Sequence, residues 1–355
     1  MARTRRRPVA DARWLWESSS GGARAARLAL LPFAALFRAT TTVRNRLFDA
    51  GILSAHELGA PAVSIGNLTV GGTGKTPLAN WFAAELTARG AHPGIVLRGY
   101  GGDEARLHEL LAPAAIVVAD ADRVRGAKAA IERGADVLVL DDAMQHRRAA
   151  RDADIVLISA DASRRSPWPL PAGPWREPLR ALRRARIVVV TSKAAAQTEI
   201  ERTVADVIEA APGVAVAVAN LAPDGLRSWD GRQSLPLDAL RGKRVLAVSG
   251  IGDPTAFEAQ LSAAGVRLTS PARFPDHHAF GAADATKLAQ RAESAELVIC
   301  TLKDAIKLGP VWPHEGTPLW YLSQRLAVER GAESLSALIA ELLAARSRKP
   351  TARLP

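Results

Sequence analysis

Short apolar runs alternate with helical stretches along most of the chain. Gly94–Leu97, Asp136–Leu140 and Ile187–Thr191 are rich in Val, Leu and Ile, whereas Leu78–Arg89 and Asp122–Arg133 have helical composition. Continuous apolar runs are typical of parallel strands that are buried on both faces. The pattern therefore predicts an α/β protein with a parallel sheet. Further strands are expected at Ala62–Ile65, Ala115–Val118, Asp154–Ser159, Val214–Val218, Lys243–Ser249, Leu297–Thr301 and Leu319–Leu322.

The stretch Ala62–Pro77 has the strand, loop and helix order of a phosphate-binding P-loop. It reads AVSIGNLTVGGTGKTP, and Thr69 stands where the general pattern has its first glycine. Backbone N–H groups of such a loop and of the following helix N-terminus bind phosphate oxygens. We expect Lys75 to reach the β- and γ-phosphates of a nucleoside triphosphate and the Thr76 hydroxyl to hold Mg²⁺. The alternative is a simple glycine-rich turn, which the GKT string disfavours. The predicted nucleotide contacts are Thr69, Val70, Gly71, Gly72, Thr73, Gly74, Lys75 and Thr76.

Acidic residues follow two of the predicted strands. Asp141 and Asp142 come directly after Asp136–Leu140, which is the Walker B arrangement of a Mg²⁺ carboxylate after a hydrophobic strand. A polar turn is the alternative for this pair. Asp103 and Glu104 follow the strand predicted at Gly94–Leu97. Because loops at the carboxyl ends of parallel strands build the sites of open α/β sheets, these two residues are candidates for acid–base or metal chemistry.

Two other segments carry candidate chemistry. Asp276, His277 and His278 lie in the string RFPDHH, but no cysteine or third histidine nearby completes a zinc site. His277 is therefore a candidate catalytic histidine facing the P-loop, with a solvated helix cap as the alternative. Trp168–Pro178 is rich in Pro and Trp and is predicted to be an irregular loop. It is either a structural connector or a lip that carries Arg176 toward an anionic substrate.

The pattern of elements divides the chain into two units. Residues 226–240 break it with Trp, Gly and Pro and are expected to form a hinge. A second strand, glycine loop and helix follow from Lys243, but without a lysine in the loop. We predict a P-loop NTPase-like α/β/α domain over residues 51–225, a smaller α/β domain over 241–346 and a frayed tail over 347–355.

The composition of the chain limits the classes of binding partner that we expect. The chain has 355 residues, of which 48% are hydrophobic, and a formal net charge of +11, which favours anionic partners. Aromatic residues make up 5% of the chain and no nucleic-acid-binding motif is present, so nucleic acid is not expected among them. The single cysteine, Cys300, excludes an internal disulfide and a cysteine-based zinc cluster. Its apolar surroundings predict a buried thiol in a reducing compartment.

The first fifty residues are basic and apolar. Arg3, Arg5, Arg6 and Arg7 open the chain, and arginines also flank the apolar segment Ala25–Phe37. That segment is shorter than the roughly 20 apolar residues of a spanning helix and contains Arg27 and Pro32. We predict over residues 1–50 a helical segment that lies on an anionic membrane surface. An ordinary helix packed on the domain is the alternative.

Together, eight strings resemble the tetraacyldisaccharide 4′-kinase family, the lipid A kinases of Gram-negative envelope synthesis. They are GNLTVGGTGKTP (66–77), LRGYG (97–101), GDE (102–104), VLDDAMQHRR (139–148), LPAGPWREP (170–178), GIGDP (250–254), FPDHH (274–278) and TLKDAIK (301–307). The resemblance implies transfer of the γ-phosphate of ATP, with Mg²⁺, to the 4′-hydroxyl of an acylated glucosamine disaccharide 1-phosphate, which gives lipid IVA. It also implies a place at the cytoplasmic face of the bacterial inner membrane and a hinge between two domains that close over ATP. No obligate protein partner is expected.

The same resemblance assigns roles to individual residues. Asp103 matches the carboxylate proposed to deprotonate the sugar hydroxyl, and His277 matches the histidine proposed to support it from the second domain. Lys75 keeps its P-loop role and acts in catalysis, and Asp141 and Asp142 match the family's acidic pair. A hydroxyl nucleophile needs a nearby carboxylate, while Mg²⁺ and a lysine spread the phosphoryl charge.

Two other classes of protein remain as alternatives. One is a nucleotide-switch ATPase or GTPase that acts on a protein partner. One branch of that class carries a lysine where this chain has Val70, and the base-reading string of GTPases has only a partial likeness in Thr301–Asp304. The other is a soluble small-molecule kinase, which the arginine-flanked apolar N-terminus disfavours.

Overall fold

The computed structural model of the protein describes residues 12–99, 103–161, 166–252, 254–276, 278–313 and 315–348. The strands are β1 Ala62–Asn67, β2 Pro93–Leu97, β3 Ile116–Ala119, β4 Val137–Asp141, β5 Ala153–Ser159, β6 Ile187–Ser192, β7 Ala215–Ser228, β8 Ser234–Leu235, β9 Arg244–Ser249, β10 Arg267–Leu268, β11 Ala272–Arg273, β12 Leu297–Cys300 and β13 Leu319–Arg330. The α-helices are α1 Ala12–Glu17, α2 Gly21–Asp49, α3 Lys75–Ala88, α4 Asp103–Leu111, α5 Arg123–Glu132, α6 Gln197–Ala210, α7 Pro254–Ala263, α8 Ala282–Arg291, α9 Leu302–Leu308 and α10 Ala332–Arg348.

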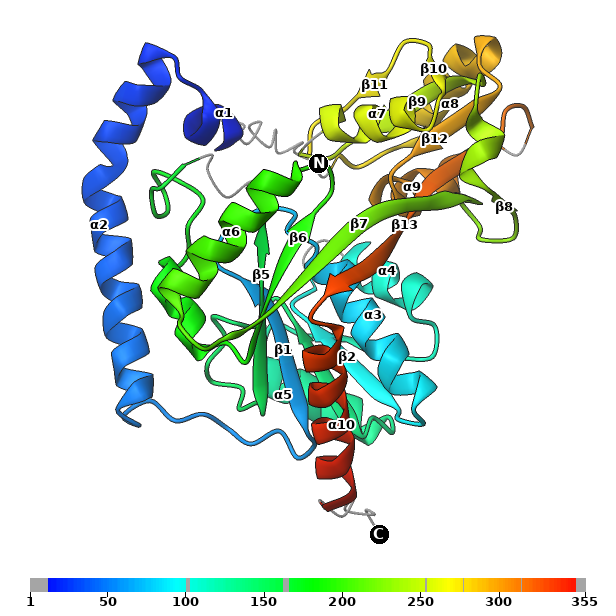
Figure 1. Cartoon of the computed structure of the whole chain (residues 1–355). Coiled ribbons are helices and arrows are strands. Elements are labelled where there is room, and N and C mark those ends of the chain that lie inside the picture. Colours follow the sequence, from blue (N-terminus) through cyan, green and yellow to red (C-terminus); the bar gives the residue numbers. More distant parts are fainter. Residues whose placement is uncertain are drawn as a thin grey trace, which may run out of the picture.

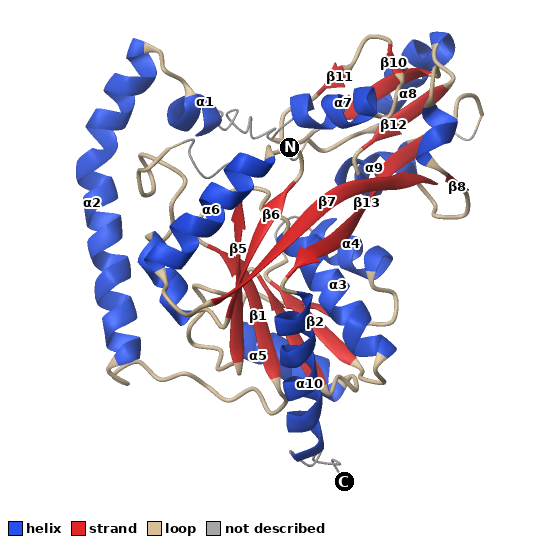
Figure 2. Ribbon diagram, viewed as in Figure 1, coloured by secondary structure: helices blue, strands red, loops and turns tan. Residues whose placement is uncertain are grey.

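Within the described residues, the strands form one 13-stranded sheet. Its order is β10-β9-β12-β13-β7-β6-β5-β1-β4-β2-β3, with β11 paired to β9 and β8 to β7. The pairs of β1 with β4 and β5 are parallel, as is that of β2 with β4, so the loops after β1, β2 and β4 lie at one edge of the sheet. Figure 2 shows helices on both sides of these strands.

The larger unit has the predicted α/β/α layers. Val137 and Val139 of β4 lie in a core that includes residues of α3 and α10, whereas Leu138 and Leu140 lie in a second core with α5. Successive side chains of a strand point to opposite faces, so β4 is buried on both. This burial is the physical reason for the continuous apolar run.

A smaller layered unit surrounds β9, β12 and the first part of β13. One of its cores contains residues of α8 and α9, and the other contains residues of α7 on the opposite face. Figure 1 shows this unit at the upper right, reached by the long strands β7 and β13. These strands pair antiparallel from Ser228↔Trp320 to Val218↔Arg330. Their length was missed because Pro223 and Gly225 in one strand, and the polar residues 323–325 in the other, are not typical of strand interiors.

Helix α10 packs on the larger unit, although the sequence placed residues 334–346 in the second domain. Leu335, Leu338, Ile339 and Leu342 belong to the same core as residues of β1 and α3. The chain therefore leaves the first core along β7 and returns to it along β13. The domain bounds 51–225 and 241–346 and the hinge at 226–240 stay predictions. The helix continues to Arg348, and residues 349–355 of the predicted tail lie outside the described residues.

Helix α2 runs along one side of the molecule, apart from the sheet (Figure 1). Its 29 residues continue through Pro32, and only Ala23 and Ala34 are buried in it. Leu28, Phe33 and Leu36 are 66%, 62% and 63% exposed. Within the described part of the chain, no helix combines the length and apolar character needed to cross a membrane. The first four arginines of the chain lie outside the described residues.

We predict that Gly66→Ala destabilises the larger unit. A Cβ at Gly66 would lie 2.6 Å from the Cβ and 2.9 Å from the backbone N of Met144, which is fully buried. The loop after β4 must then shift, so we expect the free energy of unfolding in urea to fall by about 1–3 kcal/mol. Gly21→Ala is the matched control, because no atom lies within 4 Å of its added Cβ. Equal stability of the two variants would contradict this packing argument.

Candidate active site

The predicted P-loop lies between β1 and α3. Gly74 precedes α3 with a φ of 91°, and a Cβ there would lie 2.8 Å from Leu221 Cδ1. The loop is held from inside, because Asn67 Nδ2 donates to Thr73 Oγ1 at 2.9 Å and Thr191 Oγ1 donates to the Thr73 carbonyl at 2.8 Å. The ends of β1 and β6 therefore both hold Thr73 of the loop, one through its side chain and the other through its backbone carbonyl.

Lys75 lies beside the acidic loop that follows β4. Its Nζ is 3.7 Å from Asp142 Oδ1, and Arg176 Nη1 lies 3.0 and 3.1 Å from the two oxygens of that carboxylate. Burial lowers the pKa of Lys75. Burial alone would raise the pKa of Asp142, but Lys75 and Arg176 together lower it. Arg176, for which the sequence left a structural connector and a lip facing an anionic substrate as alternatives, pairs here with Asp142.

The partners of Asp141 differ from those of its neighbour Asp142. Asp142 has a φ of 50°, so the chain turns sharply at the end of β4. Asp141 Oδ2 is 3.0 Å from His108 Nε2, and Arg123 Nη2 donates to the Asp141 carbonyl at 3.2 Å. Within the described residues, the buried Oδ1 of Asp141 has no hydrogen-bond partner.

Asp103 is the first residue of α4, rather than part of a loop as expected. Its Oδ2 is 3.0 Å from Lys307 Nζ on α9, so an ion pair joins the two units at this point. Burial raises the pKa of the neighbouring Glu104, and the charge of Asp141 raises it further. Glu104 is therefore electrostatically coupled to the acidic residues after β4.

Sequence reasoning missed His108, Arg123 and Lys307. His108 and Arg123 are 0% and 2% exposed, and each lies in a helix whose pattern shows no motif. The feature that singles out Arg123 is visible only in the structure, since arginine is almost never fully buried unless it is paired. His277 lies outside the described residues, and its neighbour His278 contacts Asp284 Oδ2 through Nε2 at 3.0 Å.

The second glycine loop, which follows β9, is held by hydrogen bonds to the buried carboxylate of Asp304. Gly250 N–H donates to Asp304 Oδ2 at 3.0 Å, and Thr301 Oγ1 donates to the same oxygen at 2.7 Å. Asp304 is 0% exposed, and its burial raises its pKa. This loop therefore has a structural role in the smaller unit.

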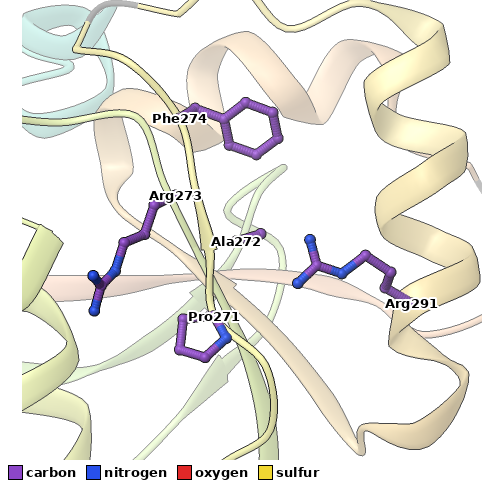
Figure 3. A pocket seen from close by; sticks show the side chains of 5 residues that line it. All are labelled: Pro271, Ala272, Arg273, Phe274 and Arg291. Carbon is purple, nitrogen blue, oxygen red and sulfur yellow. The ribbon is translucent and has the colours of Figure 1, made fainter.

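A cavity of about 570 Å³ also lies in the smaller unit, at β11 and α8. Figure 3 shows Arg273 and Arg291 on opposite sides of the segment Pro271–Phe274. Arg273 is paired with Glu258, and Arg291 Nη2 donates to the Ser270 carbonyl. Each guanidinium group thus has its own partner, and the two do not point toward a common position where an anion would bind.

Comparisons with known proteins cover most of the chain. A family model described as tetraacyldisaccharide-1-P 4′-kinase matches residues 26–344. A tetraacyldisaccharide 4′-kinase from Anaeromyxobacter dehalogenans is 38% identical over 337 residues, which cover 88% of this chain and 89% of the relative. One from Xanthomonas campestris is 36% identical over 295 residues, which cover 78% and 82%. The fold is similar to the crystal structure of LpxK from Aquifex aeolicus in complex with ATP, with a TM-score of 0.73, 31% identity and coverage of 89% of this chain and 99% of that one.

We predict that Asp304 makes stability fall as the pH rises. The pKa of Asp304 is raised in the folded state, so the folded protein binds this proton more tightly than the unfolded chain does. The protonated carboxyl therefore adds to the free energy of unfolding in full below about pH 4, the pKa range of an unperturbed aspartic acid. This contribution is lost as the pH rises through the folded-state pKa. Asp304→Asn should flatten this part of the curve of unfolding free energy against pH. Asp230→Asn is a control of opposite sign, since a hydrogen bond from Ser228 lowers the pKa of Asp230. An unchanged slope in Asp304→Asn would refute the prediction.

Proposed function

The chain belongs to the tetraacyldisaccharide-1-P 4′-kinase family, and from this membership we propose that it transfers the γ-phosphate of ATP to the 4′-hydroxyl of tetraacyldisaccharide 1-phosphate. The enzyme is a kinase that phosphorylates a lipid A precursor. The observation that carries the assignment of residues is that the P-loop, Asp141, Asp142 and Asp103 gather at the carboxyl edge of β1, β4 and β2.

The loop between β1 and α3 is the proposed ATP site. Residues 69–76 would surround the phosphates with backbone N–H groups, and the N-terminus of α3 adds its positive dipole end. Lys75 is 15% exposed and lies beside Asp142, so its ammonium is held at the mouth of the loop. We assign it the stabilisation of charge on the transferred phosphoryl group.

Thr76 and Asp141 fit a Mg²⁺ ion. Mg²⁺ commonly takes one or two carboxylates together with substrate phosphates, and Asp141 Oδ1 is a buried carboxylate oxygen without a hydrogen-bond partner in the described residues. Asp142, which is paired with Lys75 and Arg176, is less available as a direct ligand. Mg²⁺ bound there would neutralise negative charge on the phosphates during transfer.

Asp103 is the proposed general base. Its carboxylate would accept the proton of the 4′-hydroxyl as the oxygen bonds to the γ-phosphorus and the bond to ADP breaks. Lys307 pairs with this carboxylate and links the base to the smaller unit. His277 is proposed to support Asp103 from that unit.

Helix α2 is the proposed membrane contact. It exposes Leu28, Phe33 and Leu36, and the exposed Arg24 and Arg38 lie near them on the same helix. Apolar side chains next to arginines are typical of helices that lie on anionic membrane surfaces. Such a surface would present a lipid substrate to the kinase at the cytoplasmic face of the inner membrane.

We predict that Asp103→Asn lowers kcat by roughly 10²- to 10⁴-fold, because the amide cannot accept the hydroxyl proton. The assay is ATP-dependent phosphate transfer to tetraacyldisaccharide 1-phosphate in detergent. The affinity for ATP should stay close to that of the wild type, whereas Lys75→Ala should lose ATP affinity and turnover together. Full turnover by Asp103→Asn would move the base to another residue, and ATP hydrolysis without lipid product would contradict the proposed function.

We predict that the double substitution of Phe33→Asp and Leu36→Asp weakens binding to anionic liposomes by roughly tenfold or more, because two exposed apolar side chains no longer enter the lipid. Cosedimentation measures the binding. Ala39→Asp with Thr40→Asp adds the same charge at weakly apolar and polar positions of the same helix and should have a smaller effect. Equal loss in the two variants would attribute the effect to charge alone.

A further inference from the structure

A chain of hydrogen bonds joins the P-loop helix to Asp141. Asn80 Nδ2 donates to the Thr76 carbonyl at 2.7 Å, and Asn80 Oδ1 lies 3.1 Å from His108 Nδ1. On the other side of the ring, His108 Nε2 lies 3.0 Å from Asp141 Oδ2. We call Thr76, Asn80, His108 and Asp141 the buried relay.

The Thr76 carbonyl at one end of the relay determines how the Asn80 amide and the His108 ring are oriented. The Thr76 carbonyl can only accept, so the NH₂ group of Asn80 must face it and Oδ1 must face the ring of His108. His108 Nδ1 therefore donates to Asn80. A hydrogen bond between Nε2 and the Asp141 carboxylate then requires a proton on Nε2 as well, so the pair is an imidazolium ion with a carboxylate and the ring is fixed from both sides.

Three of the four members of the relay are almost closed to solvent, and Thr76 is half-buried. His108, Asn80 and Asp141 are 0%, 5% and 8% exposed, and they come from α4, α3 and β4. In a low-dielectric interior, such polar groups are costly unless every partner is present. A leucine would fill this position on α4 at lower electrostatic cost, so packing alone does not account for a histidine here.

The two ends of the relay are the two groups proposed to hold Mg²⁺. The relay reaches the backbone carbonyl of Thr76, whose hydroxyl is the proposed ligand, at one end and the Asp141 carboxylate at the other. By holding Asp141 Oδ2, His108 leaves Oδ1, which has no hydrogen-bond partner in the described residues, as the oxygen for the ion. Residues that hold a ligand in place commonly change metal affinity by about 10–100-fold when they are mutated.

We propose that His108, supported by Asn80, is the positioning residue of the metal site. This inference rests on the proposed function, because it requires Mg²⁺ between Thr76 and Asp141. His108 also lies on the helix that begins with Asp103. The same bond that orients Asp141 therefore anchors the helix that carries the proposed base.

The test measures metal affinity directly. Mn²⁺ serves as a paramagnetic probe, and its Kd for the enzyme–ADP complex is measured by electron paramagnetic resonance for the wild type and for His108→Leu. We expect the Kd to rise by roughly 10–100-fold and the Mg²⁺ concentration at half-maximal kinase rate to rise with it. Binding of a fluorescent ATP analogue without metal should change far less.

Leu107→Ala is the matched control. Leu107 is 5% exposed on the same helix and is not a member of the relay, so its truncation should lower the melting temperature without raising the Kd for Mn²⁺. Asn80→Ser removes the far bond of the relay and should raise the Kd in the same direction. It serves as the test if His108→Leu does not fold.

The outcomes separate this inference from the proposed function. Unshifted Mn²⁺ affinity in folded His108→Leu and Asn80→Ser, or an equal shift in Leu107→Ala, would overturn the positioning role alone. Phosphate transfer by the wild type that needs no divalent metal would overturn the metal site and the inference together. A shift confined to the relay variants supports it.

Discussion

Two adjacent carboxylates lie at the end of a strand that is buried on both faces, and the polar groups at this edge of the sheet are arranged around their charge. Asp141 is held by His108, whereas Asp142 is held by Lys75 and Arg176. The sharp turn at Asp142 separates the two groups, so each carboxylate meets its own cationic or hydrogen-bonding partner. Without these partners, the desolvation of two neighbouring negative charges would be very costly.

This arrangement ties distant parts of the chain to one point. The P-loop helix, α4, and the loop carrying Arg176 all contact the end of β4. The smaller unit is connected to the same edge of the sheet by the ion pair between Lys307 and Asp103. The proposed metal ligands, the proposed base and the P-loop therefore share supporting residues at the end of β4.

The sequence predicted the elements whose signal is local. The strand, loop and helix order around the P-loop string and the neighbouring buried strands follow from short patterns, and the structure has these elements. His108 was missed because its role depends on Asn80 and Asp141, which are 28 and 33 residues away. The position of α10 was missed for the same reason, since an apolar helix pattern does not reveal which core the helix covers.

The position of α10 has a consequence for the order in which the chain is made. Its leucines complete the core that contains Val63 and Phe82, yet α10 follows the whole smaller unit along the chain. The whole smaller unit is synthesised before that core can close. The larger unit must therefore wait with an uncovered apolar face during translation, and a chain that stops before Ala332 leaves that face exposed to chaperones and proteases.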